Sequence, residues 1–178
     1  MKQAWFRSRY SDSLMADIVD AATRSRMMSG IRGKDTKPEL LVRRGLHSRG
    51  FRFRLHGANL PGRPDLVLPK YSAAIFVHGC FWHAHDCSLA KMPKTRPDFW
   101  KAKLSANQAR DARQLVELQT LGFRTLVIWE CSLRGPQELV TFTLDRADEW
   151  LRREEQSAEI SRADWQQLRP PLEGSEGR

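Results

Sequence analysis

Eleven consecutive residues, Val77–Cys87, hold three of the chain's five histidines and two of its three cysteines. They follow the most apolar short run of the sequence, Ala73–Val77, which we expect to form a buried strand. Thiolate sulfur and imidazole nitrogen are the ligands that Zn²⁺ prefers in proteins. Phe81 and Trp82 lie between these candidate ligands. The stretch therefore predicts a metal centre and a functional site at the end of a strand.

The third cysteine, Cys131, completes a candidate zinc site. Forty-three residues separate it from Cys87, and it closely follows a second apolar run, residues 124–129. If the two runs are neighbouring strands, three thiolates and one imidazole can form a closed, tetrahedral, structural Zn²⁺ site. His83 and His85 point to opposite sides of an extended chain, so one can bind the metal while the other acts elsewhere. The spacing does not decide which histidine is the ligand, and a buried free thiol with loop histidines is the alternative.

Asp65 is the second candidate for chemistry. The dipeptide Pro64-Asp65 opens an expected strand, residues 65–68. A carboxylate there can hold Mg²⁺ against a scissile phosphate, as in nucleases with a Pro-Asp…(Asp/Glu)-x-Lys signature. The next strand lacks that acid and lysine, so the carbonyl of Val77 and the imidazole of His78 would have to replace them. Because Pro-Asp is common in turns, a purely structural turn is the alternative.

Glu39 is the best nearby candidate for a further catalytic acid, because the first helix is expected to pack beside Asp65. The alternative is an exposed first-turn glutamate that the helix dipole favours.

The charge distribution favours a polyanionic partner. The net charge is +9; residues 43–54 hold five arginines and no acid, and residues 91–113 hold seven lysines and arginines against two aspartates. Such clusters are typical of nucleic-acid-binding proteins, although a solvated basic surface is the alternative. No apolar run is long enough for a signal peptide or a membrane span. The odd number of cysteines argues against a disulfide framework and favours a reducing compartment.

Three aromatic residues, Phe81, Trp82 and Trp100, lie among basic residues. Apolar side chains flanked by lysine and arginine can wedge between base pairs. Alternatively, they cover the zinc-binding loop or the core.

Periodicity and turn signals predict an α/β fold with a central mixed sheet flanked by helices. In the first helix we expect Leu40, Leu41 and Leu46 to face the core, and Arg43 and Arg44 to face away from it. The expected helices cover residues 36–50, 98–121 and 136–152, and the expected strands cover residues 51–55, 65–68, 73–77 and 124–129. We divide the chain into a flexible arm (1–22), a catalytic domain (23–152) and a disordered polar tail (153–178).

Several motifs together resemble the very-short-patch-repair (VSR) DNA mismatch endonuclease family of bacteria. The resemblance covers about residues 16–151, and the run His-Gly-Cys-Phe-Trp-His is highly specific. The matching motifs are Ala22–Ser25, Pro61–Asp65, His78–His83, Pro93-x-Thr95-Arg96, Phe99-Trp100, Asn107, Arg110-Asp111 and Trp129–Cys131.

The resemblance implies a single restriction-endonuclease-like domain that nicks DNA 5′ to the thymine of a T·G mismatch, which arises when 5-methylcytosine deaminates. It implies that Asp65 and the carbonyl of Val77 bind Mg²⁺, that His83 is the general base, and that His78 and Glu39 assist. The implied structural zinc ligands are Cys80, His85, Cys87 and Cys131. The implied DNA-contacting residues are the wedge of Phe81, Trp82 and Trp100, together with Met28 from the opposite groove, Arg24, Lys103 and Asn107.

The sequence departs from the family pattern at Val77, where threonine is common, and at Ala84 and Asp86, which replace further histidines. None of these changes removes an implied ligand. The resemblance also implies a monomer in the bacterial cytoplasm, associated with the nucleoid, with other mismatch-repair proteins as further partners. Three alternatives stay open: a non-catalytic zinc-bearing DNA-binding protein, a nuclease with another mismatch or sequence preference, and a catalytic zinc site.

Overall fold

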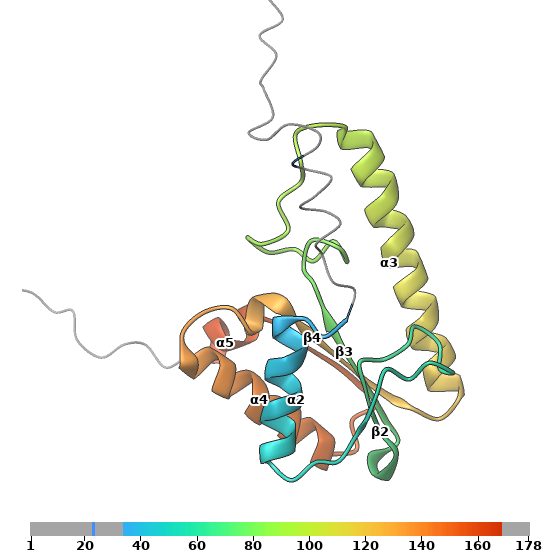
Figure 1. Ribbon diagram of the computed structural model, residues 1–178, viewed down its shortest axis with the longest axis vertical. Coiled ribbons are helices and arrows are strands. Elements are labelled where there is room, and N and C mark those ends of the chain that lie inside the picture. Colours follow the sequence, from blue (N-terminus) through green and yellow to red (C-terminus); the bar gives the residue numbers. More distant parts are fainter. Residues whose placement is uncertain (1–22, 24–33, 169–178) are drawn as a thin grey trace, which may run out of the picture. The chain divides into compact units, whose positions relative to one another are not determined.

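The computed structural model describes residue 23 and residues 34–168 of the 178-residue chain (Figure 1). The predictions for the arm 1–22, for Arg24 and for Met28 lie outside these residues, as does the end of the predicted tail, 169–178.

A five-stranded mixed sheet forms the centre of residues 34–168, in the order β1-β2-β3-β4-β5. β1, β2 and β3 are antiparallel neighbours, whereas β3, β4 and β5 run parallel. The strands are β1 (Arg54–Leu55), β2 (Leu66–Leu68), β3 (Ala73–His78), β4 (Arg124–Trp129) and β5 (Ser157–Ile160). The predicted α/β class with a mixed sheet is confirmed. The strand expected over 51–55 is shorter, because only its last two residues pair with β2.

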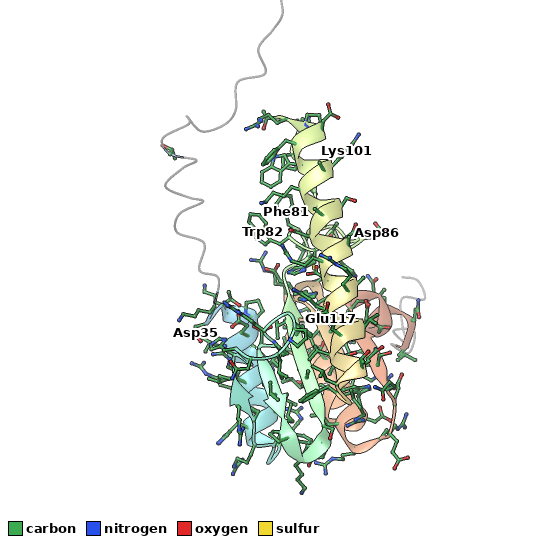
Figure 2. The ribbon with its side chains drawn as sticks, turned by 90° about the vertical axis from the view of Figure 1, so that its right-hand side faces the viewer. Asp35, Phe81, Trp82, Asp86, Lys101 and Glu117 are labelled. Carbon is green, nitrogen blue, oxygen red and sulfur yellow. The ribbon has the colours of Figure 1, made fainter. Side chains whose placement is uncertain are left out.

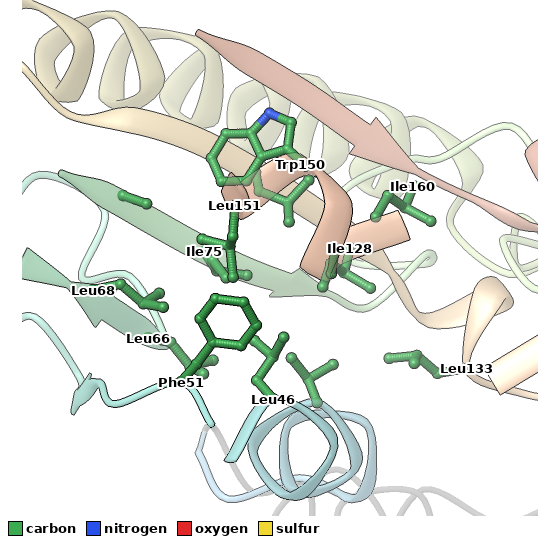
Figure 3. Close-up of a cluster of buried hydrophobic side chains, with 14 residues drawn as sticks. Leu46, Phe51, Leu66, Leu68, Ile75, Ile128, Leu133, Trp150, Leu151 and Ile160 are labelled. Atoms are coloured by element: carbon green, nitrogen blue, oxygen red, sulfur yellow. The ribbon is translucent and has the colours of Figure 1, made fainter. Parts of the chain in front are cut away.

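Helices cover both faces of the sheet, which explains why β3 and β4 read as continuous apolar runs. The helices are α2 (Lys37–Ser48), α3 (Pro97–Thr120), α4 (Gln137–Arg152) and α5 (Arg162–Leu168), with short 3₁₀ turns η1 (Pro69–Tyr71) and η2 (Glu130–Ser132). Ile75 of β3 packs in one core with Leu46 of α2 and Trp150 of α4 (Figure 3). Its neighbour Phe76 packs on the opposite face with Leu118 of α3.

α3 is the longest helix among the described residues and extends well past the sheet (Figure 1). Its 24 residues give a length of about 36 Å at 1.5 Å per residue. Only Leu104 and Leu118 of α3 are buried. Its amino-terminal half is therefore free to support the loop that follows β3 rather than the sheet.

α2 begins as predicted but buries a different face. Thr36 caps it in a capping box with Glu39. Leu46 is buried as expected, but Leu41 is 39% exposed while Arg43 is only 8% exposed, so both of those predictions are wrong. The buried face follows the i, i+3, i+4, i+7 spacing through residues 39, 42, 43 and 46. Arg43 can be buried because its charge is paired with Glu39, one turn earlier.

The prediction of a disordered tail from residue 153 is wrong for the described part of that segment. β5 pairs with β4 through four residues, and Ile160 is 4% exposed. β5 completes the sheet because β4 would otherwise present an open edge. The sequence of β5 did not predict a strand, because only two of its four residues, Ala158 and Ile160, are apolar and face inward. The folded domain therefore extends to residue 168. Among the described residues, no helix is long and apolar enough to cross a membrane.

Candidate active site, metal centre and nucleic-acid interface

Two strands bring the three cysteines together. β3 and β4 are parallel neighbours, so the loops that follow them leave the same edge of the sheet. The backbone N–H of Cys131 donates to Cys80 Sγ at 3.3 Å, and Cys131 Sγ lies 3.7 Å from His85 Nδ1. Donor atoms of Cys80, His85, Cys87 and Cys131 all lie within 4.8 Å of one another. His85 therefore joins the cysteines, and His83 does not.

The donor set fits a soft divalent metal ion. Ligand atoms of a tetrahedral zinc site are separated by roughly 3.3–3.8 Å, and Cys131 Sγ and His85 Nδ1 lie 3.7 Å apart. The hydrogen bond between Cys80 and Cys131 lowers the pKa of Cys131 and raises that of Cys80, so the two buried thiols share a proton. The backbone N–H of Arg162 also donates to Cys131 Sγ at 3.5 Å. A bound cation would let both sulfurs ionise, which these residues alone do not favour.

His78 and His83 form a second group on the α3 side of the sheet. Their rings stack with centroids 3.7 Å apart and an interplanar angle of 4°. His83 Nδ1 lies 2.6 Å from Asp111 Oδ2 of α3. Burial, reinforced by His83, lowers the pKa of His78 to about 3, so this ring is neutral. With Nδ1 directed at a carboxylate, His83 is oriented to accept a proton at Nε2.

A cavity of about 330 Å³ lies beside these histidines. It is lined by residues of the 60–63 turn, of β3 and of α3, including Arg63, Arg110 and Gln114. Two cationic side chains next to a polarised histidine suit an anionic substrate.

Asp65 lies at the same end of β3 but in a different group of side chains from His78. The backbone N–H of Val77 donates to Asp65 Oδ2 at 2.7 Å. Burial raises the pKa of Asp65 to about 6, against the opposing effect of that hydrogen bond, and nearby Glu39 adds to the increase. Oxygen or nitrogen donors of Glu39, His56 and Asp65 lie within 4.8 Å of one another, so these three residues could hold a metal ion.

Glu39 is 4% exposed, so the alternative of an exposed first-turn glutamate is wrong. Its carboxylate accepts hydrogen bonds from the backbone of Asp35, from Thr36 and from Arg43. The structure therefore brings Glu39 to Asp65, as expected. However, the Glu39 carboxylate is already hydrogen-bonded within the protein.

Trp129 lies between the Cys/His group and the two histidines. Its ring stacks on His85 at 4.2 Å and 17°, and it meets His78 edge-on at 5.5 Å. Its indole N–H donates to Glu159 Oε2 of β5 at 2.8 Å. The segment beyond residue 152 thus helps to fix the site.

Phe81 and Trp82 of the 79–90 loop lie beside the amino-terminal half of α3 (Figure 2), where their rings contact that of Trp100. The centroid of Phe81 lies 5.1 Å from that of Trp82 and 5.2 Å from that of Trp100. All three rings are only partly buried. Asn107 of α3 holds the loop, because its amide donates to the carbonyl of Trp82 at 2.9 Å. Lys103 is exposed on the same helix.

Comparison with known proteins decides the family. A family model described as DNA mismatch endonuclease Vsr matches residues 16–89. The DNA mismatch endonuclease Vsr of Escherichia coli K12 is 47% identical over 147 residues, which cover 82% of this chain and 94% of the relative. The chain belongs to the Vsr family.

Further relatives of this Vsr protein are type II nicking enzymes. V.XorIIP of Xanthomonas oryzae pv. oryzae is 47% identical over 119 residues, covering 67% of this chain and 88% of the relative. V.NmeAIP of Neisseria meningitidis is 44% identical over 121 residues, covering 68% and 86%. The expected family and the expected DNA endonuclease activity are confirmed, and the protein is a hydrolase that acts on DNA.

Sequence reasoning assigned no role to three residues of the Vsr site: Arg43, His56 and Asp111. Asp111 gave a weak signal, as an acid within a basic helix. His56 gave none, because backbone pairing brings it beside Asp65, and the sequence does not reveal this pairing: the His56 N–H donates to the Asp65 carbonyl at 3.2 Å.

Proposed function

We propose that this Vsr-family endonuclease nicks one strand of duplex DNA on the 5′ side of the thymine in a T·G mismatch, in a reaction that depends on Mg²⁺. The observation that supports the proposal is what gathers at the end of β3: Asp65 accepts a hydrogen bond from Val77 of this strand, and the loop that follows the strand carries both His83, paired with Asp111, and two rings of the aromatic cluster. A proposed metal ligand, a proposed base and a candidate DNA wedge are thus all attached to one strand end.

Asp65 would hold Mg²⁺ together with the carbonyl of Val77. A residue in a β-ladder directs its N–H and its C=O to the same edge, and the Val77 N–H already contacts Asp65. The carbonyl of Val77 therefore faces the same region as the Asp65 carboxylate. When bound there, Mg²⁺ would polarise the scissile phosphate and stabilise the charge that develops on it.

His83 would be the general base. Its Nε2 would take a proton from the attacking water, and Asp111 would stabilise the resulting imidazolium. Water attacks phosphorus, the bond from phosphorus to the 3′ oxygen breaks, and the products are a 3′-hydroxyl and a 5′-phosphate. The neutral ring of His78 would fix His83 by stacking and assist at the phosphate, and Glu39 would support the site through its negative charge.

The Cys80, His85, Cys87 and Cys131 group would hold a structural Zn²⁺. Four protein donors leave no open coordination position, which favours a structural over a catalytic zinc. Zinc would fix the loop that carries Phe81, Trp82 and His83, and so link mismatch sensing to the cut.

Phe81, Trp82 and Trp100 would enter the base stack at the mismatch, where unstacking costs less than in matched DNA. Arg24, Met28 and Lys103 would add further DNA contacts. Asn107 would act there mainly by holding Trp82, since its amide is engaged within the protein.

The enzyme would act as a monomer in the bacterial cytoplasm at the nucleoid, together with other mismatch-repair proteins. Three reduced cysteines and a DNA substrate support that compartment.

A panel of end-labelled duplexes, identical except for one T·G, matched or other mismatched pair, tests the proposal. Nicking 5′ to the thymine of T·G alone, with Mg²⁺ and not with EDTA, is the expected result. Cuts at another mismatch would show a different mismatch preference. Binding of the duplexes without any cut, in the presence of each divalent ion tested, would show that the protein binds DNA without catalysis.

A further inference from the structure

A buried arginine lies beneath the proposed Mg²⁺ site. Arg43 of α2 is 8% exposed, and its guanidinium donates to Glu39 Oε2 at 2.7 Å and to Asp35 Oδ1 at 2.5 Å. It also approaches His56 Nε2 to 3.5 Å. Arginine keeps its charge at any physiological pH, so a fixed positive charge stands within this cluster.

The carboxylate of Glu39 is saturated. Its Oε2 atom accepts from the Asp35 N–H at 2.9 Å and from Arg43, and its Oε1 atom accepts from the Thr36 hydroxyl at 2.8 Å and the Thr36 N–H at 3.4 Å. An ionised carboxylate has about four lone-pair sites, and four donors occupy them. A metal ion could bind Glu39 only by displacing one of these donors.

The carboxylate of Asp65 is open by comparison. Its Oδ2 atom accepts from Val77, whereas no described residue forms a hydrogen bond to Oδ1. Enzymes with two metal ions hold them about 3.5–4 Å apart between shared ligands. Donor atoms of Glu39, His56 and Asp65 lie within 4.8 Å of one another, close enough to bind an ion beside the one at Asp65, but the Arg43 guanidinium contacts Glu39 and approaches His56.

We propose that Arg43 is a fixed cation that takes the place of a second metal ion, so that this corner binds one divalent ion, at Asp65, instead of two. The inference rests on the proposed function in one respect, the assignment of Asp65 as a metal ligand. Arg43 is a positioning residue, because it is too buried to contact DNA and acts through Glu39 and His56. Repulsion between a guanidinium and a divalent ion excludes the second ion.

Mn²⁺ binding to the zinc-containing protein without DNA tests this. Equilibrium dialysis and electron paramagnetic resonance (EPR) count the bound Mn²⁺ ions in each protein with and without the additional substitution Asp65→Asn. The wild type is expected to bind one ion that depends on Asp65, with the EPR signal of an isolated Mn²⁺. Arg43→Gln frees Glu39 and His56 and is expected to bind two ions, with an EPR signal broadened by coupling between neighbouring ions. Adding Asp65→Asn to this variant should abolish binding of both ions.

Arg44→Gln is the matched control, because it makes the same change in charge on the exposed neighbouring residue and should still bind one ion. Two coupled ions in the wild type, or a folded Arg43→Gln protein that still binds one, would overturn the inference.

If Arg43→Gln does not fold, the wild type and Arg43→Lys decide, since lysine keeps the charge and both proteins should bind one ion. A second ion in either would contradict the role of Arg43. Failure of the proposed function looks different: Asp65→Asn would then leave Mn²⁺ binding unchanged in every variant.

Discussion

His83 Nδ1 and Asp111 Oδ2 lie 2.6 Å apart, joining the loop after β3 to the middle of α3. Asp111 therefore fixes the ring orientation and the tautomer of the proposed base. We expect Asp111→Asn to lower the nicking rate by about 10²–10⁴-fold, because an amide can stabilise the wrong tautomer and does not stabilise the imidazolium. Single-turnover nicking of a T·G duplex measures this loss.

Affinity for the duplex should change little in Asp111→Asn, because the Asp111 side chain is paired with His83 and only 16% exposed. Asp98→Asn removes an exposed carboxylate from the same helix and should nick at the wild-type rate. A wild-type rate in Asp111→Asn would remove His83 from the role of base.

Asp65→Asn should abolish nicking but stabilise the protein in buffer without Mg²⁺. Burial raises the pKa of Asp65 from 3.8 to about 6, so between these pH values the folded state binds the proton more tightly than the unfolded chain. The contribution of Asp65 to stability therefore falls as pH rises from about 4 through about 6, and stays low at pH 7. The asparagine variant should gain on the order of 1–3 kcal/mol at pH 7 and almost nothing at pH 4.

Urea unfolding at the two pH values measures the difference between the Asp65→Asn variant and the wild type. An equal effect at pH 4 and pH 7 would show that ionisation of Asp65 carries no penalty in the folded protein.

Cys131→Ser should lose the bound metal and unfold at lower temperature. Cys131 is 2% exposed and lies at the centre of the Cys/His group, and removing a ligand removes metal-binding energy that contributes to folding. We expect a loss of at least about 3 kcal/mol, or roughly 6–12 °C for a domain of this size. Elemental analysis and calorimetry check both effects. A metal-free Cys131→Ser protein with wild-type stability would exclude a structural role for the metal.

The parts of the fold set by local patterns were predictable, and the parts set by tertiary pairing were not. Apolar runs located β3 and β4, and the cysteines that follow them indicated a candidate metal group at the ends of these strands, with His85 chosen only through the family resemblance. Arg43 could not be predicted as buried, because a charged residue enters the core only when its partner is known. His56 meets Asp65 through the register of a hairpin, and β5 owes its place to the open edge of β4 rather than to its own composition.

Ile160→Ala should destabilise the domain even though it lies beyond the predicted folded region. Ile160 is 4% exposed in the core shared with Leu133 and Trp150, and truncating such a residue typically costs about 2–4 kcal/mol. Chemical denaturation measures the loss. Ser157→Ala, at an exposed position of the same strand, should change stability by less than about 0.5 kcal/mol. Equal, negligible effects at both positions would contradict the packing of β5.

Phe81→Ala and Trp82→Ala should reduce the preference for mismatched over matched DNA. Each ring lies with Trp100 in the partly buried aromatic cluster, and loss of one stacked base costs about 1–3 kcal/mol, or roughly 5–150-fold in affinity. Competition binding with T·G and C·G duplexes in the absence of Mg²⁺ measures the ratio. Val116→Ala, at a 61% exposed apolar residue farther along α3, should leave the ratio unchanged. If both aromatic variants keep the wild-type ratio, these rings do not enter the base stack, and mismatch recognition must lie elsewhere on the protein.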